Sequence, residues 1–224
     1  MASRRIFVLG LGNPAPYTET LHSAGNLALA ALQRRYADIF PPFAKARYGK
    51  ATVQMTSGPR ITLLQSTSFM NTSGAWARKV LRQARQGGDP ESCGVILVYD
   101  ELEQAPGVVK ARQWYSSARG HRGVKSVQEH VTPTTTMRMA RIGIGIGRPE
   151  HRVSSVVAEY VLSPMSDKAK NAIEGTAEDL MRCIEGIENE WATTEPPYAP
   201  VITGVDSEII WGPEHEKLFN KEDQ

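Results

Sequence analysis

Short apolar runs alternate along the chain with longer segments that repeat apolar residues at helical spacing. The apolar runs are bounded by Gly, Pro or Ser, which predicts strands at 5–10, 52–57, 61–65, 94–99, 108–112 and 142–146. Helical spacing predicts helices at 25–37, 73–86, 123–131 and 166–191. This alternation is typical of an α/β fold, so we expect a single domain with a mixed, largely parallel twisted sheet flanked by helices on both faces.

The composition changes near the end of the chain. Residues 193–216 are Pro-rich and acidic and lack helical periodicity, which predicts an extended or partly disordered insertion followed by a C-terminal segment at 217–224. We therefore expect the α/β domain to comprise residues 1–192.

Composition restricts the class of protein. With 41% hydrophobic residues and a formal net charge of +2, the sequence resembles that of an ordinary soluble globular protein, so any basic surface must be local. Cys93 and Cys183 lack metal-binding spacing and suggest neither a disulfide framework nor a zinc site. No apolar run is long enough to span a membrane, and the N-terminus enters a strand at once. We expect a cytosolic protein, with a cleaved mitochondrial form as the alternative.

Polar clusters follow the first and fourth predicted strands, beginning at Asn13 and Asp100. Ligand sites in such sheets lie at the carboxyl ends of the strands, so we expect these loops to be neighbours at one rim. The glycines of "GLGNPA" (10–15) formally fit a dinucleotide fingerprint. We reject that interpretation because Pro14 delays the helix by about ten residues, too far to place its N-terminus on a pyrophosphate.

Three side chains near this rim are suited to acid–base chemistry. His22 lies at the start of the first helix, and a carboxylate from Asp100 would favour the imidazolium formed when the ring takes a proton from water. Asn13 offers an amide that both donates and accepts hydrogen bonds. The structural alternatives are a capping or surface role for His22, a helix or turn cap for Asp100, and a tight turn at the glycines.

Two further segments are candidates for binding. In "FMNTSG" (69–74), Asn71, Thr72 and Ser73 fit a helix N-cap, while Phe69 and Met70 are either core residues or an apolar wall beside the site. Basic residues with neighbouring aromatics and glycines, which suit RNA, are Lys110, Arg112, Arg119, His121, Arg122 and Lys125. Arg148, His151 and Arg152 form a second basic cluster. The alternative is a solvated cationic loop.

These motifs together resemble the bacterial-type peptidyl-tRNA hydrolase family. They occur in that family's order, from "GLGNP" through "FMNTSG", "YDELE", the Gly/His loop and "IGIGRP" to "VVAEYVLSP". The "SARGH" form of the loop is similar to the eukaryotic branch. The resemblance implies an enzyme that cleaves the ester between a peptide and the 3′ ribose of tRNA, without metal or cofactor.

The resemblance also implies roles for individual residues. His22 would be the general base that activates water, Asp100 its orienting partner, and Asn13 the amide that holds the substrate and steadies the oxyanion. Residues implied in substrate binding are Tyr17, Met70, Asn71, His121 and Arg122. Residues implied in tRNA binding are Lys110, Arg112, Arg119 and Arg152.

Three departures from the family pattern affect the expected grip on tRNA rather than the chemistry. Arg122 replaces an asparagine of the loop, and Leu21 replaces the arginine usually found before the catalytic histidine. Gly143 stands where the family usually has an arginine, and we expect Arg141, on the same face of the strand, to reach the same phosphate.

Three functions are therefore weighed. The first is a monomeric peptidyl-tRNA hydrolase whose partner is tRNA carrying a peptidyl group, with no membrane association. The second is an RNA-binding or ribonucleoprotein subunit that kept the fold, lost most catalysis and docks a protein partner through 193–216. The third, an esterase for small molecules, is disfavoured by the basic loops. Salt distinguishes them, because RNA contacts weaken steeply as ionic strength rises.

Overall fold

The computed structural model describes residues 5–86, 93–131 and 137–194 of the chain. Its strands form one sheet in the order β2-β3-β4-β1-β5-β7-β6. The bounds are β1 (Arg5–Gly10), β2 (Ala44–Tyr48), β3 (Ala51–Ser57), β4 (Ile61–Gln65), β5 (Cys93–Glu101), β6 (Val109–Gln113) and β7 (Arg138–Gly145). The central strands β4, β1, β5 and β7 are parallel, and antiparallel strands extend the sheet on both sides. The predicted fold class is confirmed.

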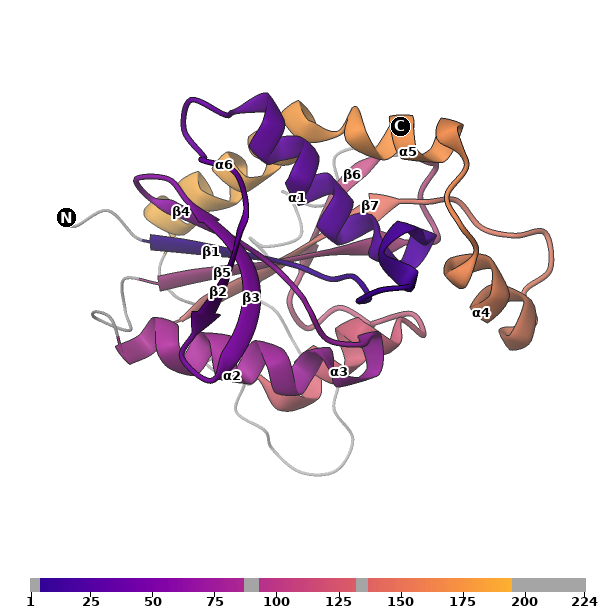
Figure 1. Cartoon of the computed structure of the whole chain (residues 1–224), viewed down its shortest axis with the longest axis horizontal. Helices are drawn as coiled ribbons and strands as arrows, with labels where there is room; N and C mark the ends of the chain where they lie inside the picture. The colour runs from indigo at the N-terminus through magenta and orange to yellow at the C-terminus, as the bar shows by residue number, and fades with distance from the viewer. Residues whose placement is uncertain (1–4, 87–92, 132–136, 195–224) are drawn as a thin grey trace.

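Helices cover both faces of this sheet (Figure 1). Their bounds are α1 (Ala24–Arg35), α2 (Ser73–Gln86), α3 (Arg122–His130), α4 (Ser154–Leu162), α5 (Asp167–Glu174) and α6 (Ala177–Thr193). Alternate residues of β1 point to opposite faces, so Ile6 and Val8 pack with α1, α5 and α6, while Phe7 and Leu9 pack with α2 and α3. Each face therefore has its own apolar core. None of the described helices is long and apolar enough to span a membrane.

The prediction missed β2 and α4 and merged two helices. β2 has no apolar run because it is an edge strand with Lys45 exposed, and α4 buries only Val161. The segment predicted as one helix at 166–191 is two, α5 and α6, separated at Gly175 and Thr176. The insertion at 193–216 and the segment at 217–224 lie outside the described residues, apart from the last residue of α6 and Thr194.

The topology brings the two polar clusters together. β1 and β5 are adjacent and parallel, with Gly10 opposite Val98, so their carboxyl ends open at the same rim, as predicted. Two 3-10 turns, Tyr17–Glu19 and Leu21–Ser23, separate β1 from α1, so no helix begins directly after the glycines. This agrees with our rejection of a dinucleotide site.

Candidate active site

His22 and Asp100 form the centre of the site. Asp100 is the second-to-last residue of β5 and is only 2% exposed. His22 lies in the 3-10 turn before α1. The Nδ1 atom of His22 is 2.9 Å from Oδ1 and 3.0 Å from Oδ2 of Asp100. Nε2 of His22 has no hydrogen-bond partner within the described ranges, and the ring lines a cavity. A carboxylate on Nδ1 keeps a proton there and leaves the lone pair on Nε2 free to accept one.

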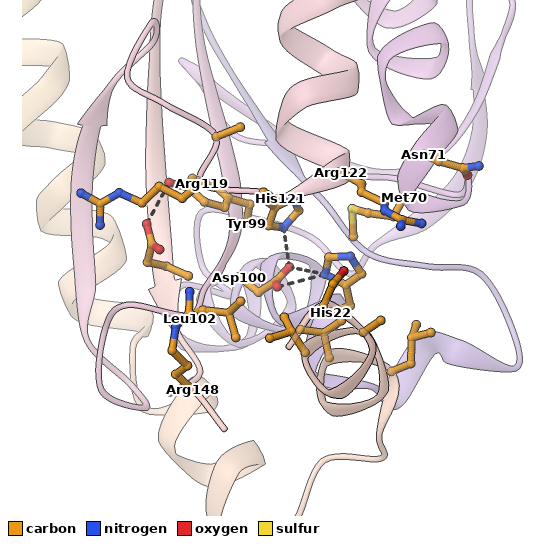
Figure 2. A pocket seen from close by; sticks show the side chains of 18 of the residues that line it. His22, Met70, Asn71, Tyr99, Asp100, Leu102, Arg119, His121, Arg122 and Arg148 are labelled. Atoms are coloured by element: carbon orange, nitrogen blue, oxygen red, sulfur yellow. Dashed lines mark hydrogen bonds and ion pairs between the residues drawn. The ribbon is translucent and has the colours of Figure 1, made fainter. Parts of the chain in front are cut away.

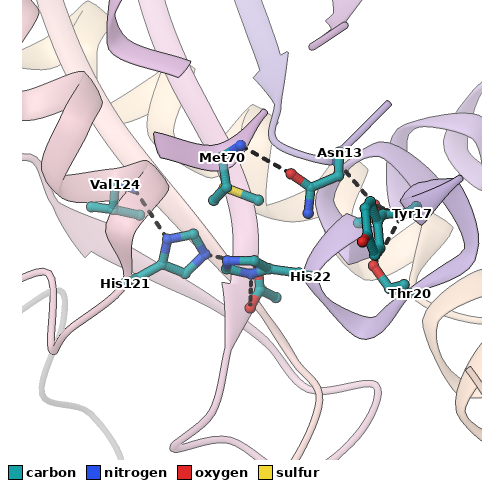
Figure 3. A network of polar contacts seen from close by, with 9 residues as sticks. Asn13, Tyr17, Thr20, His22, Met70, His121 and Val124 are labelled. Atoms are coloured by element: carbon teal, nitrogen blue, oxygen red, sulfur yellow. Dashed lines mark hydrogen bonds and ion pairs between the residues drawn. The ribbon is translucent and has the colours of Figure 1, made fainter. Parts of the chain in front are cut away.

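A second imidazole shares the same carboxylate (Figures 2 and 3). His121 caps α3, where its Nδ1 accepts the backbone N–H of Val124 at 3.1 Å. Its other nitrogen, Nε2, therefore carries the proton and donates to Oδ1 of Asp100 at 2.8 Å. One side-chain nitrogen or oxygen of each of His22, Asp100 and His121 lies within 4.8 Å of the other two. Because Nε2 of His121 is a proton donor here, the trio fits a hydrogen-bonded chain rather than a set of metal ligands.

The charge state of this cluster follows from its burial and its pairing. Burial disfavours a charged His22, but the charge and hydrogen bond of Asp100 together outweigh burial and raise the pKa of His22 above its usual value. The positive charge of Arg122 acts in the opposite direction and lowers this pKa. Burial also opposes ionisation of Asp100, yet the two imidazoles hold the pKa of its carboxyl well below the usual range. Asp100 is therefore ionised at neutral pH.

Asn13 has one fixed orientation. Its Oδ1 accepts the backbone N–H of Met70 at 2.9 Å, so its amide NH2 is left to donate, and that group has no partner among the described residues (Figure 3). Its own backbone N–H donates to Oγ of Ser23 at 3.0 Å, and the Ser23 hydroxyl donates to the Tyr17 carbonyl at 2.8 Å. Asn13 is thus held on two sides while its amide nitrogen faces the cavity that His22 also lines.

The cavity has a volume of about 620 Å³ and is lined by residues from five regions of the chain (Figure 2). Phe69, which is 52% exposed, and buried Met70 form one apolar wall. Met70 lies close against α3, where a Cβ on Gly123 would be 2.1 Å from the Met70 sulfur. The wall contributed by α4 is also mostly apolar and includes Val157 and Val161. The space suits a substrate whose apolar parts contact these walls while its polar parts reach His22, Asp100 and Asn13.

Asn71 is exposed and lines the cavity, but among the described residues no side chain of the expected N-cap accepts an N–H of α2. The hydroxyls of Thr72 and Ser73 donate to the Phe69 carbonyl. The Gly74 N–H instead donates to Oγ of Ser126 on α3 at 3.1 Å, and the Ser126 hydroxyl donates to the Asn71 carbonyl at 3.0 Å. One serine of α3 therefore fixes both the start of α2 and the backbone of Asn71.

The predicted tRNA-binding residues occupy two different situations. Arg119 and Arg152 are exposed and line the cavity together with Arg122. Lys110 and Arg112 lie on β6 and do not line it, and Nε of Arg112 is 3.7 Å from the buried carboxylate of Glu101. Tyr17 is 40% exposed and also lies outside the cavity lining, where its carbonyl supports Ser23.

The expectation that Arg141 reaches a phosphate is wrong. Arg141 is 1% exposed, and its guanidinium donates to the carbonyls of Gln113, at 3.2 Å, and Ser116, at 2.6 Å. The buried guanidinium of Arg141 therefore fixes the start of the loop between β6 and α3. The arginine of the family does not fit at Gly143 either, because a Cβ there would lie 2.9 Å from the Glu101 Cβ.

The sequence analysis missed Ser23, the wall formed by α4, and the role of Tyr99. The Tyr99 ring packs edge-on against His121, with centroids 5.3 Å apart, and burial raises the pKa of its hydroxyl to about 12. Of these features, only Ser23 could have been found from the sequence, because it directly follows His22. Arg148 was grouped with the basic residues, but its guanidinium forms an ion pair with Glu103 at the cavity edge.

Comparison with known proteins identifies the family. A family model described as peptidyl-tRNA hydrolase matches residues 7–195. A peptidyl-tRNA hydrolase of Haemophilus influenzae is 33% identical over 181 residues, covering 80% of this chain and 88% of the relative. One of Alteromonas mediterranea is 35% identical over 186 residues, covering 83% and 90%.

A solved peptidyl-tRNA hydrolase from Acinetobacter baumannii has the same fold. It superposes with a TM-score of 0.63 at 22% identity and covers 88% of this chain and 98% of that one. The matched residues run from within β1 to the end of α6 and include Asn13, His22 and Asp100. The chain therefore belongs to the peptidyl-tRNA hydrolase family.

Proposed function

We propose that this protein is a peptidyl-tRNA hydrolase that releases the peptide from tRNA by hydrolysis of the ester at the 3′ ribose. The observation that carries the proposal is the arrangement of His22 and Asn13 at one cavity. The Nδ1 atom of His22 is held by Asp100, which leaves Nε2 as a base, and Met70 fixes the Asn13 amide so that its NH2 is left to donate. A base and an oriented donor beside an accessible cavity are the groups that ester hydrolysis requires.

The reaction follows from these positions. Nε2 of His22 takes a proton from water as the water oxygen attacks the ester carbonyl carbon, and Asp100 stabilises the imidazolium that forms. The carbonyl oxygen becomes an oxyanion, to which the Asn13 NH2 donates a hydrogen bond. The bond to the ribose oxygen then breaks, and the imidazolium returns its proton to that oxygen. The products are the 3′ hydroxyl of tRNA and the peptide acid, which ionises to the carboxylate by releasing a proton to solvent, and no step needs a metal or cofactor.

Substrate binding is assigned by position within the same cavity. Met70, Asn71 and His121 flank the reacting centre, so we assign to them the peptide and the terminal nucleotide. Arg119, Arg122 and Arg152 surround the cavity with positive charge, which suits the phosphates next to the ester. An inactive RNA-binding subunit is not favoured, because the departures at Leu21, Arg122 and Gly143 leave the catalytic set of His22, Asp100 and Asn13 complete.

The proposal extends to the domain organisation, the oligomeric state and the cellular compartment. Residues 1–192 act as one catalytic domain, and the chain works as a cytosolic monomer. Neither Cys93 nor Cys183 forms a disulfide among the described residues, which suits a reducing compartment. Docking of a protein partner through residues 193–216 is tested by deleting them. A deletion that leaves turnover intact and removes a bound protein would support that role. Fractionation of cells that express the tagged full chain tests the compartment, and recovery with mitochondria would contradict a cytosolic location.

Single-turnover cleavage of a purified N-blocked aminoacyl-tRNA tests the activity. We expect rapid release of the blocked amino acid by the wild-type protein and a loss of about 10³-fold in His22→Ala, since a positioned base contributes about 10²–10⁴-fold. Asn13→Ala is the second variant, and thermal unfolding verifies that both proteins fold. Salt-sensitive binding of tRNA without release by the wild-type protein would overturn the proposal and support the binding module instead.

A further inference from the structure

The two helical layers of the molecule carry opposite charge. α2 bears Arg78, Lys79, Arg82 and Arg85, and no acidic residue occurs between Ser73 and Gln86. α6, on the other side of the sheet, bears Glu178, Asp179, Glu185, Glu188 and Glu190 against Arg182 alone (Figure 1). The formal net charge of +2 conceals this separation. A polyanion approaching the protein is attracted to the α2 side and repelled from the α6 side.

Ion pairing makes the contrast sharper. On the α1–α5–α6 side, Arg34 pairs with Glu174 at 3.0 Å and Arg35 pairs with Glu178 at 2.6 Å. Arg60 pairs with Glu188 on α6 at 2.6 Å. These carboxylates neutralise three of the basic side chains on that side of the sheet.

The basic residues of α2 are not neutralised in this way. Arg78, Lys79 and Arg82 are exposed, and none of them has an ion-pair partner in the part of the chain that the structure describes. Their charge is therefore available to an external partner. It is also exposed to solvent, so an interaction with it must weaken as salt increases.

The exposed basic residues of α2 (Arg78, Lys79 and Arg82) form a stripe that leads away from the cavity. Arg78 and Arg82 are four residues apart and project from the same side of α2. At about 1.5 Å of rise per residue, they lie roughly 10 and 16 Å along the chain from Asn71, which lines the cavity. α3 packs against the start of α2 through the Gly74–Ser126 hydrogen bond of 3.1 Å.

The exposed side of α3 continues the stripe to the cavity. Arg122, which lines the cavity, and Lys125 are three residues apart on this side of the helix, and both are exposed. Lys125 lies 3.9 Å from the carboxylate of Glu129, but both side chains are largely open to solvent, so this pair is weak. The basic surface, defined as Arg78, Lys79, Arg82, Arg122 and Lys125, therefore reaches from the mouth of the cavity along α2.

We propose that this basic surface binds phosphates of the tRNA beyond its 3′ end, an inference that rests on the proposed function. RNA whose terminal ester reaches His22 must leave the cavity across a neighbouring surface, and RNA backbones are bound by Lys and Arg. On the β6–β7 side, the side chain of Arg112 pairs with Glu101 and that of Arg141 is buried under a loop. α2 offers side chains that are not engaged in this way, so the acceptor arm lies over α2 and α3.

The test compares two variants that each lose three positive charges. One is Arg78→Gln/Lys79→Gln/Arg82→Gln on α2, and the matched control is Arg35→Gln/Lys168→Gln/Arg182→Gln on the opposite layer, where all three side chains are also exposed. The dissociation constant for uncharged tRNA is measured between about 50 and 200 mM KCl. We expect about tenfold weaker binding by the α2 variant and a salt slope smaller by about 2, at roughly 0.7–0.9 per lost phosphate contact. The control should bind as the wild type does.

A short substrate separates failure of this inference from failure of the proposed function. The short substrate is an N-blocked aminoacyl ester of a CCA trinucleotide, which is too short to extend over α2. A wild-type protein that cleaves neither this ester nor the tRNA ester contradicts the proposed function. A wild-type protein that cleaves both, with an α2 variant of unchanged tRNA affinity and salt slope, overturns the inference alone.

Two controls complete the design. Equal weakening in both triple variants would show an effect of net charge only and would also overturn the inference. If the α2 triple variant does not fold, Arg78→Gln and Arg82→Gln are measured singly, and unchanged binding in both has the same meaning.

Discussion

The floor and the rim of the cavity are built in opposite ways. On the floor, His22, Asp100 and Asn13 are buried or nearly so, and hydrogen bonds from the protein itself set their orientation. At the rim, Arg119, Arg122 and Arg152 are exposed, and their side chains have no hydrogen-bond or ion-pair partners among the residues described. The floor is arranged by contacts within the protein, whereas no such contact holds the side chains of the rim among the residues described.

This difference teaches where each kind of substitution should act. Groups that are already oriented stabilise the transition state without reorganising, so changes to the floor should lower kcat. Exposed charges lose side-chain freedom on binding and are screened by salt, so changes to the rim should alter KM and its salt dependence. A floor substitution that altered KM alone would break the comparison.

The largest effect is expected for Asp100→Asn. The amide cannot stabilise an imidazolium, and its NH2 would face the N–H groups of two imidazoles that now donate to a carboxylate. We expect kcat to fall about 10³-fold, because His22 loses its correct tautomer as well as its charge partner. Single-turnover rates measure the loss, and a chemical denaturation curve separates it from destabilisation. A rate within tenfold of the wild type would show that Asp100 has no part in catalysis.

Asn13→Asp should have the next largest effect. The aspartate keeps an oxygen for the Met70 N–H, so the local fold is retained, but the NH2 that faces the cavity is replaced by a second acceptor. Removal of one oxyanion donor costs about 10²-fold in kcat. The measurement is kcat and KM under multiple turnover, with Asn13→Ala for comparison. If Asn13→Asp retains full kcat, the oxyanion is stabilised elsewhere.

Much of the floor is predictable because local patterns encode it. The runs at β1, β4 and β5 are apolar on both sides, as strands covered on both faces must be, and parallel pairing then places Asn13 and Asp100 at one rim. The residues alone made His22 a candidate for acid–base chemistry beside Asp100, with a cap as the alternative, and the family resemblance assigned it the role of general base. Its hydrogen bond to Asp100 spans 78 positions of sequence and leaves no local pattern.

Other contacts of the site were not predictable for the same reason. His121 was assigned to the substrate, but it also binds Asp100 and caps α3, two contacts that depend on how the loop folds back. Arg141 was expected to reach a phosphate because it lies on the same face of the strand as Gly143. Only the tertiary structure reveals that the carbonyls of Gln113 and Ser116 turn inward to receive its guanidinium.

Arg122→Asn tests the one rim residue that also influences the floor. The positive charge of Arg122 lowers the pKa of His22, so its removal should raise that pKa further. His22 acts as a base only when neutral, so the rate rises with pH through this pKa, and the rising limb should move to higher pH in the variant. On the plateau above the pKa, we expect cleavage about two- to fivefold faster, because an asparagine offers an acceptor that a guanidinium lacks.

The measurement for Arg122→Asn is the pH profile of single-turnover cleavage. Lys168→Asn is the control, since Lys168 is an exposed basic residue of α5 on the opposite layer and does not line the cavity. A slower plateau in Arg122→Asn would mean that the guanidinium has become part of the grip on the substrate. A rising limb that moves to lower pH would contradict the electrostatic effect of Arg122 on His22.

The smallest effect is expected for Ser23→Ala, which probes how the floor is held together. The Ser23 hydroxyl accepts the Asn13 N–H and donates to the Tyr17 carbonyl, and the residue is 1% exposed. Its loss leaves a buried N–H without an acceptor, which costs about 1–3 kcal/mol of folding stability. Because Asn13 then loses one of its two anchors, kcat should fall about two- to threefold while KM stays constant. Urea denaturation and steady-state kinetics measure the two effects, and a loss of stability with unchanged kcat would show that the Met70 contact alone orients the Asn13 amide.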